Sequence, residues 1–429
     1  MSTAGKRGVA LTGRAVVSPL GVGIDAHWNA LLEGRRAVTT PARLAALGLD
    51  AARGAPVAPE LVQPHLGRLP RKQQKLYNRA TLLGMLAAAL AMEDAGLAPG
   101  AGDPLRFGVL LGVNALSWEL GAMTQYLVAA ESREASGTLD MALANTFCMK
   151  NINPLDYSLK TLPNLAAGHL AIAHDAQGLC RAMTEGPVGG ARAIGQAFRL
   201  VEEGDLDVAL CGGTDAQLEE LLFANYCGAG VLAADDGSRA GFAAGEGSGI
   251  LVLESRERAQ ARGAIVHGEI LGYAAGAGDG ALVCDVETSP SVERLARVIE
   301  LACEEAGAEP DLVSVHGDGS PAHERAEHEA LRRVFGERIR AIPVVRMKDA
   351  HGDLGAASCP VELLACSAAL QHDMIPPVVS SFSETQGVSP ELTATGRHGL
   401  RRRALVLSLG LFGESAALML GKAGVTDAR

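Results

Sequence analysis

Aromatic residues are scarce in this chain of 429 residues, at 3% of the sequence. Hydrophobic residues nevertheless make up 48%, so the chain can bury a large core built of Ala, Val, Leu and Gly. Small apolar side chains of this kind suit closely packed helices and layered sheets. Charged residues are only 20%, and this composition excludes a largely disordered chain. The length allows two or three average domains, or one large two-lobed domain.

The chain also lacks a surplus of basic residues, an apolar run long enough to span a membrane, and closely spaced cysteine pairs. The net charge of −11 argues against nucleic acid as a partner, because phosphate binding needs a basic face. No apolar run approaches the length of a membrane span, and residues 1–13 lack the apolar stretch of a secretory signal. We therefore expect a cytoplasmic protein with no membrane partner.

The cysteines show neither a C-x-x-C pair nor zinc-site spacing, so we expect free, buried thiols in a reduced compartment, and no metal or cofactor. They stand at positions 148, 180, 211, 227, 284, 303, 359 and 366.

Hydrophobic periodicity is the clearest positive signal. It predicts strands at residues 8–18, 107–112, 205–213, 242–254 and 312–316, and helices at residues 24–32, 69–97, 291–306 and 324–335. This alternation of strands and helices, repeated in two parts of the chain, favours sheets covered by helices on both faces.

One stretch, residues 164–200, predicts a helix, a turn, a strand, a sharp turn and a second helix. The second helix should begin within residues 186–190, and Ile194, Ala197 and Phe198 are spaced to bury one face. Acyl-transfer enzymes often place a nucleophile at a small-residue turn of this kind. The helix dipole stabilises a thiolate there, and free backbone N–H groups can hold an oxyanion.

The pairs Gly168-His169 and the run Ile194-Gly195-Gln196-Ala197 resemble the motif of the β-ketoacyl synthases, a family of the thiolase superfamily. In that family a Gly-His pair precedes a cysteine-led helix that ends in Ile-Gly-x-Ala. The frame fits without a gap and places the reactive cysteine at position 187, which is proline. Proline has neither a thiol nor a backbone N–H. In that family this N–H is one of the two donors of the oxyanion hole. Pro187 therefore removes both the nucleophile and an oxyanion donor.

The resemblance covers nearly the whole chain. Residues 241–254 match the family's G-F-x-x-G-E-G-x-G-x-x-x-L-E signature, the most specific positive match. The resemblance implies the five-layered α-β-α-β-α thiolase fold with two pseudo-repeated halves, residues 1–257 and 258–429. It also implies a capping insertion at about residues 114–160, which in the family caps the dimer and lines the acyl tunnel. The sheets of two subunits should pair edge to edge near residues 207–211.

A condensing synthase of this family also needs two histidines that polarise the malonyl thioester carbonyl, and a lysine that supports the second. His316, in the run H-G-D-G-S, stands at the first position, where a hydrogen-bonded structural role is the alternative. Lys348 is retained, and the gap-free frame places Asp353 at the second histidine, whereas a two-residue slip would place His351 there. An ionised carboxylate repels the enolate that an imidazole would stabilise. Asp353 should instead form an ion pair with Lys348.

The last motif is the family's G-F-G-G-T-N turn, whose Phe gates the tunnel and whose loop supplies the other oxyanion donor. Residues 410–415 read G-L-F-G-E-S, so Leu411 takes the gating position and Phe412 replaces the following glycine. No other nucleophile is well placed. Cys180 falls in an expected turn too far upstream, and no histidine is positioned to activate the hydroxyl of Thr184.

The joint loss of cysteine, one histidine, gate and glycine turn predicts a chain-length-factor-like (KS-beta) subunit. Such a subunit is catalytically silent, pairs with a cysteine-containing β-ketoacyl synthase, and shapes the acyl tunnel in type II polyketide, polyene or fatty-acid-like biosynthesis. Chain length factors usually carry Gln where this chain has Pro187.

Acyl carrier protein is the other expected partner. The basic helix start at residues 71–79 is either its docking surface or a solvated helix end. The alternative function is enzymatic: a malonyl-carrier-protein decarboxylase or acyltransferase that uses His316 and Lys348.

Overall fold

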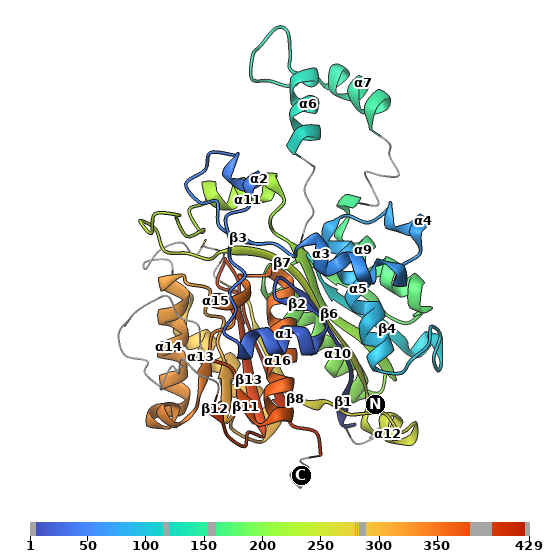
Figure 1. Ribbon diagram of the computed structural model, residues 1–429, viewed down its shortest axis with the longest axis vertical. Coiled ribbons are helices and arrows are strands. Elements are labelled where there is room, and N and C mark those ends of the chain that lie inside the picture. The colour runs from blue at the N-terminus through green and yellow to red at the C-terminus, as the bar shows by residue number, and fades with distance from the viewer. Residues whose placement is uncertain are drawn as a thin grey trace.

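The computed structural model describes residues 6–114, 120–152, 160–278, 280, 282, 289–377 and 397–424, and Figure 1 shows their arrangement. The strands are β1 (Val9–Ser18), β2 (Gly21–Val22), β3 (Gly54–Ala55), β4 (Phe107–Gly112), β5 (Cys180–Met183), β6 (Val208–Ala216), β7 (Ala244–Ser255), β8 (Gly268–Gly276), β9 (Leu312–Ser314), β10 (Val344–Val345), β11 (Met374–Ile375), β12 (Arg397–His398), β13 (Arg403–Leu409) and β14 (Ser415–Gly421). The longer helices are α1 (Ile24–Leu32), α5 (Arg79–Asp94), α6 (Leu120–Ala130), α7 (Met141–Asn151), α9 (Pro163–His174), α10 (Val188–Glu203), α11 (Glu220–Gly228), α13 (Val292–Ala306), α14 (Pro321–Phe335) and α16 (Ser358–His372). The short helical segments are α2 (Ala42–Ala45), α3 (Pro59–Val62), η1 (Gln63–Arg68), α4 (Arg71–Gln74), η2 (Pro104–Arg106), α12 (Arg256–Ala261), η3 (Gly336–Ala341), α15 (Lys348–His351) and η4 (Gly355–Ala357).

A twelve-stranded mixed sheet runs through the molecule, and its main path contains two copies of one topology. The first half has the spatial order β5-β4-β6-β7-β1, and the second has the order β10-β9-β13-β14-β8. In the first half, β7 pairs antiparallel with β1 and β6, and β4 pairs parallel with β5 and β6. In the second half, β14 pairs antiparallel with β8 and β13, and β9 pairs parallel with β10 and β13. The halves meet where β1 pairs with β8. The predicted internal repeat is therefore confirmed; the division at residues 257 and 258 stays a prediction.

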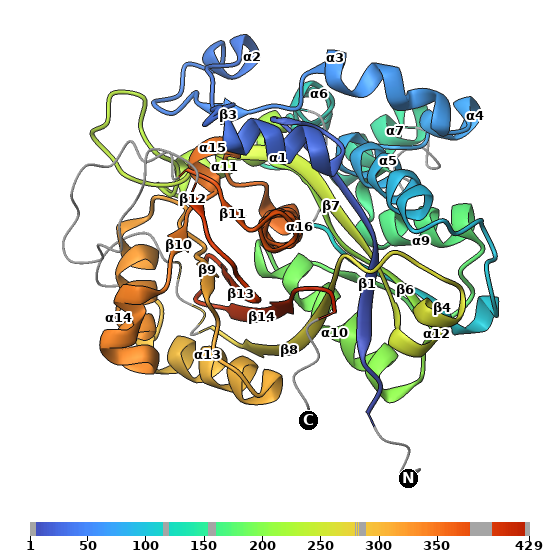
Figure 2. The same ribbon diagram turned by 60° about the horizontal axis from the view of Figure 1, so that its bottom comes forward.

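The helices form three layers around the two halves of the sheet. Helices α5 and α9 cover the outer face of the first half, and α13 and α14 cover the outer face of the second (Figure 2). Helices α10 and α16 lie between the halves: α10 contacts β6 and β14, and α16 contacts β7 and β13. This arrangement confirms the predicted five layers, α-β-α-β-α.

The middle layer is packed backbone against backbone, which explains why small residues replace aromatic ones there. A Cβ atom added at Gly190 of α10 would lie 2.0 Å from the carbonyl oxygen of Ala356, and one added at Gly213 of β6 would also lie 2.0 Å from it. A Cβ atom added at Gly112 of β4 would lie 2.3 Å from the backbone nitrogen of Gly190. Only glycine allows these approaches, so the start of α10 is held tightly between β4, β6 and η4.

Three local predictions are wrong. The helix predicted over residues 69–97 is broken, because α4 ends at Gln74 and Asn78 caps a new helix by accepting a hydrogen bond from the Thr81 backbone N–H. Strand β6, which contains most of residues 207–211, lies between β7 and β4 and is not a sheet edge. The outer strand of this half is β5, so Cys180 lies in a strand and not in a turn.

The cysteines are only partly as expected. Of the described ones all are free, but they differ in exposure: Cys211, Cys359 and Cys366 are buried, whereas Cys180 is exposed. Cys284 lies outside the described residues. The described part of the chain contains no helix long and apolar enough to cross a membrane.

The insertion predicted at residues 114–160 contains helices α6 and α7, which project away from the layered body (Figure 1). Residues 115–119 and 153–159 of this insertion lie outside the described part. Three of its apolar side chains are largely exposed: Val128 at 72%, Met141 at 73% and Met149 at 78%.

Candidate active site

The sharp turn between β5 and α10 carries Pro187 where a nucleophile is expected. Gly186 has a φ of +59°, a left-handed conformation that favours glycine, and Pro187 follows as the N-cap of α10. The carbonyl oxygen of Pro187 accepts a hydrogen bond of 3.1 Å from the Ser408 hydroxyl. Proline suits a helix start because the first backbone N–H groups have no partner within the helix. The turn thus presents a pyrrolidine ring, without a thiol or an N–H, at the N-terminus of α10.

His316 lies just after β9 and is held by its backbone. The backbone N–H groups of His316 and Gly317 donate to the two carboxylate oxygens of Glu327, at 2.6 and 3.0 Å. Lys348 Nζ donates to the His316 carbonyl oxygen at 2.8 Å and to Glu362 Oε1 at 2.7 Å. Lys348 is therefore paired with Glu362, and the predicted ion pair between Lys348 and Asp353 is wrong.

Asp353 lies beside His316, and His351 does not. Asp353 Oδ2 is 4.0 Å from His316 Nε2, while Oδ1 accepts hydrogen bonds from the Gly355 backbone N–H at 2.7 Å and from Gln217 Nε2 at 3.2 Å. The His351 ring is buried 5.7 Å from the His27 ring of α1, with Nδ1 2.7 Å from the Gly352 carbonyl oxygen. The structure thus brings Asp353 next to His316 and His351 next to His27, and the assignment of Asp353 to the second-histidine position stays a prediction.

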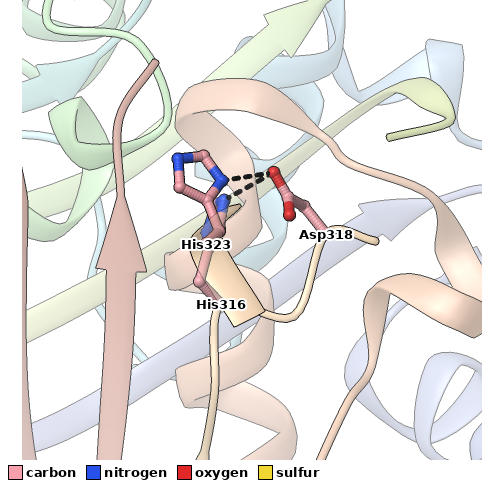
Figure 3. A group of neighbouring side chains, drawn as sticks. All are labelled: His316, Asp318 and His323. Atoms are coloured by element: carbon pink, nitrogen blue, oxygen red, sulfur yellow. Dashed lines mark hydrogen bonds and ion pairs between the residues drawn. The ribbon is translucent and has the colours of Figure 1, made fainter. Parts of the chain in front are cut away.

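A cluster of His316, Asp318 and His323 lies next to this carboxylate (Figure 3). Asp318 Oδ2 is 2.7 Å from His323 Nδ1 and 3.4 Å from His316 Nε2. The two imidazole rings meet edge to face, with centroids 5.2 Å apart, and all three residues are buried. The three ligand atoms lie within 4.8 Å of one another, so this cluster could hold a metal ion. Sequence reasoning missed His323, whose position in the first turn of α14 became visible only when the helix start was known.

Burial sets the protonation of this cluster. It lowers the pKa of His316 to about 4, with a further lowering from the Lys348 charge. Burial alone would raise the pKa of Asp318, but His323 and His316 outweigh it and hold that pKa well below its usual value. Burial also opposes protonation of His323, yet Asp318 raises its pKa above the ordinary value. At neutral pH, His316 is an uncharged imidazole beside an ionised Asp318.

Three buried carboxyl groups surround these residues, and sequence reasoning assigned a role to none of them. Burial raises the pKa of Asp215, Glu327 and Glu362 to about 7 in each case. The sequence could have pointed to Glu362, because it is a single acidic residue in the mostly apolar first three turns of α16, which are fully buried. The raised pKa values favour the neutral form of these three groups more than in ordinary carboxyl groups.

The turn at residues 410–415 is closed by an acidic side chain. Glu414 Oε2 accepts a hydrogen bond of 3.1 Å from the Phe412 backbone N–H. Leu411 is half-buried against an apolar cluster that includes Phe223 of α11, whereas Phe412 is 47% exposed. The Glu414 side chain thus occupies one backbone N–H of this turn.

The remaining predicted residues lie apart from this centre or are already paired. Cys180 begins β5, at the opposite end of that strand from Pro187, and Thr184 is exposed. In the basic helix start, Arg79 pairs with Glu246 at 2.8 Å, while the cations of residues 71–75 are exposed.

Comparison with known proteins gives family models and relatives that agree with one another. Residues 6–259 match the family model described as Beta-ketoacyl synthase, N-terminal domain, and residues 267–381 match the C-terminal domain of the same description. The chain is 30% identical to Nodulation protein E of Rhizobium sp. (strain N33), over 87% of this chain and 89% of that protein. It is 29% identical to the tetracenomycin polyketide synthase ketoacyl synthase alpha subunit of Streptomyces glaucescens, over 89% of this chain and 88% of that protein.

Solved structures with the same fold cover nearly all of the chain. The ishigamide ketosynthase/chain length factor superposes with a TM-score of 0.81 at 27% identity, over 98% of this chain and 100% of that one. A β-ketoacyl synthase from Burkholderia phymatum superposes with a TM-score of 0.82 at 24% identity, over 97% of this chain and 100% of that one, and shows the fold alone.

Proposed function

Because the chain belongs to the β-ketoacyl synthase family, we propose that it is the catalytically silent, chain-length-factor-like subunit of a synthase pair. Pro187 carries this proposal. It occupies the N-cap of α10, where an acylated cysteine would stand, and it can neither form a thioester nor donate a backbone hydrogen bond.

The rest of the centre supports a silent role. Decarboxylation of a malonyl thioester develops negative charge on the thioester oxygen, which donors must stabilise. Here the carboxylate of Asp353 faces that region, and His316 Nε2 lies 3.4 Å from Asp318 Oδ2. Lys348 donates to Glu362 and to the His316 carbonyl oxygen, so the decarboxylase or acyltransferase alternative has less support.

The partner that we propose is a cysteine-containing β-ketoacyl synthase. Strand β5 ends the first half of the sheet, and its open edge offers backbone groups to a strand of another subunit. The exposed apolar side chains of α6 and α7, which project from the body, give this partner a second surface to cover. A solved relative with this fold is described as a ketosynthase/chain length factor, which supports the same kind of pair.

We also propose acyl carrier protein as a transient partner of the pair. Arg71, Lys72 and Lys75 are exposed and suit an acidic protein surface. The similarity to the tetracenomycin subunit supports a type II polyketide or fatty-acid-like pathway.

Co-expression with a cysteine-containing synthase tests this function. We expect the two chains to elute together in size-exclusion chromatography, through an interface of obligate size, roughly 2,000 Å² or more. Product profiling of the pair should give longer or differently distributed chains than the synthase alone. Separate elution, or identical products with and without this chain, would refute the chain-length-factor assignment.

A further inference from the structure

The cluster of His316, Asp318 and His323 has the donor set of a transition-metal site, although the sequence shows no zinc spacing of cysteines. Two ring nitrogens, His316 Nε2 and His323 Nδ1, converge on one carboxylate oxygen, Asp318 Oδ2, from 3.4 and 2.7 Å (Figure 3). Imidazole and carboxylate ligands suit Zn²⁺. The three residues fall within eight positions of the chain, in the loop after β9 and the first turn of α14, so folding of this loop brings them together.

The cluster is buried, and a second carboxyl group lies beside it. All three side chains are almost completely buried. A second carboxylate, that of Asp353, lies 4.0 Å from His316 Nε2. Two buried carboxyl groups and two imidazoles supply the oxygen and nitrogen donors that a divalent transition-metal ion binds.

One ligand separation already fits a zinc site, and another must open. In a tetrahedral zinc site with bonds of about 2.0–2.1 Å, neighbouring ligand atoms lie roughly 3.3 Å apart. The Asp318–His316 separation of 3.4 Å fits, and the Asp318–His323 separation of 2.7 Å must open by roughly 0.6 Å. All three ligand atoms lie within 4.8 Å of one another.

From this geometry we propose that His316, Asp318 and His323 bind one Zn²⁺ ion, with Asp353 or water completing the coordination. The ion joins the loop after β9 to α14 and occupies His316 Nε2, so that atom cannot polarise a thioester. The site is thus structural, and it is independent of whether the chain pairs with a synthase.

Metal analysis of the untagged protein tests the proposal. The chain is expressed with added Zn²⁺, passed through EDTA and gel filtration, and measured by inductively coupled plasma mass spectrometry. We expect about one zinc ion per chain. Protein grown with Co²⁺ should show a ligand-field absorption band in the visible range, and zinc loading should raise the Tm. Zinc at background level together with no cobalt band would overturn the proposal and leave a hydrogen-bonded cluster only.

Variants locate the ion. His323→Gln and Asp318→Asn should each reduce bound zinc to background, whereas His328→Gln, which changes a half-buried histidine farther along α14, should leave it at the wild-type level. If Asp318→Asn does not fold, His323→Gln and the cobalt spectrum of the wild type still test whether the cluster binds the ion. Full zinc retention in folded His323→Gln would place the ion elsewhere and overturn the assignment.

Discussion

At the scale of single residues, Pro187 lacks both a thiol and a backbone N–H, whereas most other residues at this position would lack only the thiol. A serine or glutamine at this N-cap would lose the thiol but keep the backbone N–H, and proline loses both. Its carbonyl oxygen is held by Ser408 and its neighbour Gly186 adopts a left-handed turn, so the local backbone remains the tight turn that a nucleophile needs.

Pro187→Cys should therefore restore acylation weakly and condensation not at all. The variant regains a thiol and an N–H at the start of α10, where the helix dipole favours a thiolate. Asp353 still faces His316, and Glu414 still occupies the Phe412 N–H. Intact-protein mass spectrometry with an acyl-carrier-protein thioester should show at most slow acyl transfer. Robust condensation by this single variant would mean that the carboxylates do not block the chemistry; Pro187→Ser is the matched control and should show neither activity.

His27 gives a prediction about stability and pH. Burial lowers its pKa from the ordinary 6.5 to about 3. Between these values the unfolded chain binds a proton that the folded chain does not, so the free energy of unfolding falls as the pH drops below 6.5. Between pH 7 and pH 5 this loss is at most about 2 kcal/mol, since each pH unit below 6.5 contributes about 1.4 kcal/mol.

The variant His27→Asn keeps a side chain that can bond the Ser18 hydroxyl, which lies 2.7 Å from His27 Nδ1. Urea unfolding at pH 7 and pH 5 should show a smaller loss of stability on acidification for this variant than for the wild type. His398→Asn, at an exposed histidine, should behave like the wild type. An equal acid dependence of His27→Asn and the wild type would show that His27 is not neutral in the folded protein.

At the scale of elements, the outer strand β5 is the part most open to a partner. Val109 N–H donates to the Leu179 carbonyl at 2.8 Å, and Val113 N–H donates to the Met183 carbonyl at 3.0 Å. Because backbone groups alternate along a strand, those of Cys180 point away from β4 and toward the open edge.

Cys180→Pro should weaken association with the synthase because it removes an edge N–H without removing a bond to β4. Cys180→Ser keeps the N–H and should associate as the wild type does. Co-elution in size-exclusion chromatography measures this, with the Tm of the isolated variant confirming that it folds. If folded Cys180→Pro still associates fully with the synthase, β5 is not the pairing edge.

Elements with strong periodicity could be predicted from the sequence, and those set by long-range pairing could not. Strand β1 and helix α1 were predicted within one residue because apolar residues lie at both ends of each element and turn residues follow β1. The edge position of β5 depends on which strands pair across the sheet, and no local pattern encodes this. In the site, motif spacing alone assigns Pro187, His316 and Asp353 to their family positions, and this assignment stays a prediction. Lys348 was assigned the wrong partner, because Glu362 reaches it from a separate helix.

At the scale of the whole molecule, residues of both halves meet in the middle layer, where Gly190 of α10 packs against Ala356 of η4 and Gln217 donates to Asp353. Pro187 comes from the first half, and His316, Lys348 and Asp353 come from the second. A complete fold that joins both halves around a centre without a nucleophile is most simply explained by a partner that needs the fold's surface. The account therefore depends on the centre being chemically silent by itself.

The most direct test incubates malonyl-acyl carrier protein with the isolated chain and follows the carrier protein by mass spectrometry. We predict that the malonyl form persists at the rate of a control without protein, and that neither acetyl nor β-ketoacyl carrier protein accumulates. The partner synthase, assayed alongside, shows that the substrate is competent. Acetyl product formed by the isolated chain, and lost in His316→Ala, would contradict the silent-subunit account and identify the chain as a decarboxylase.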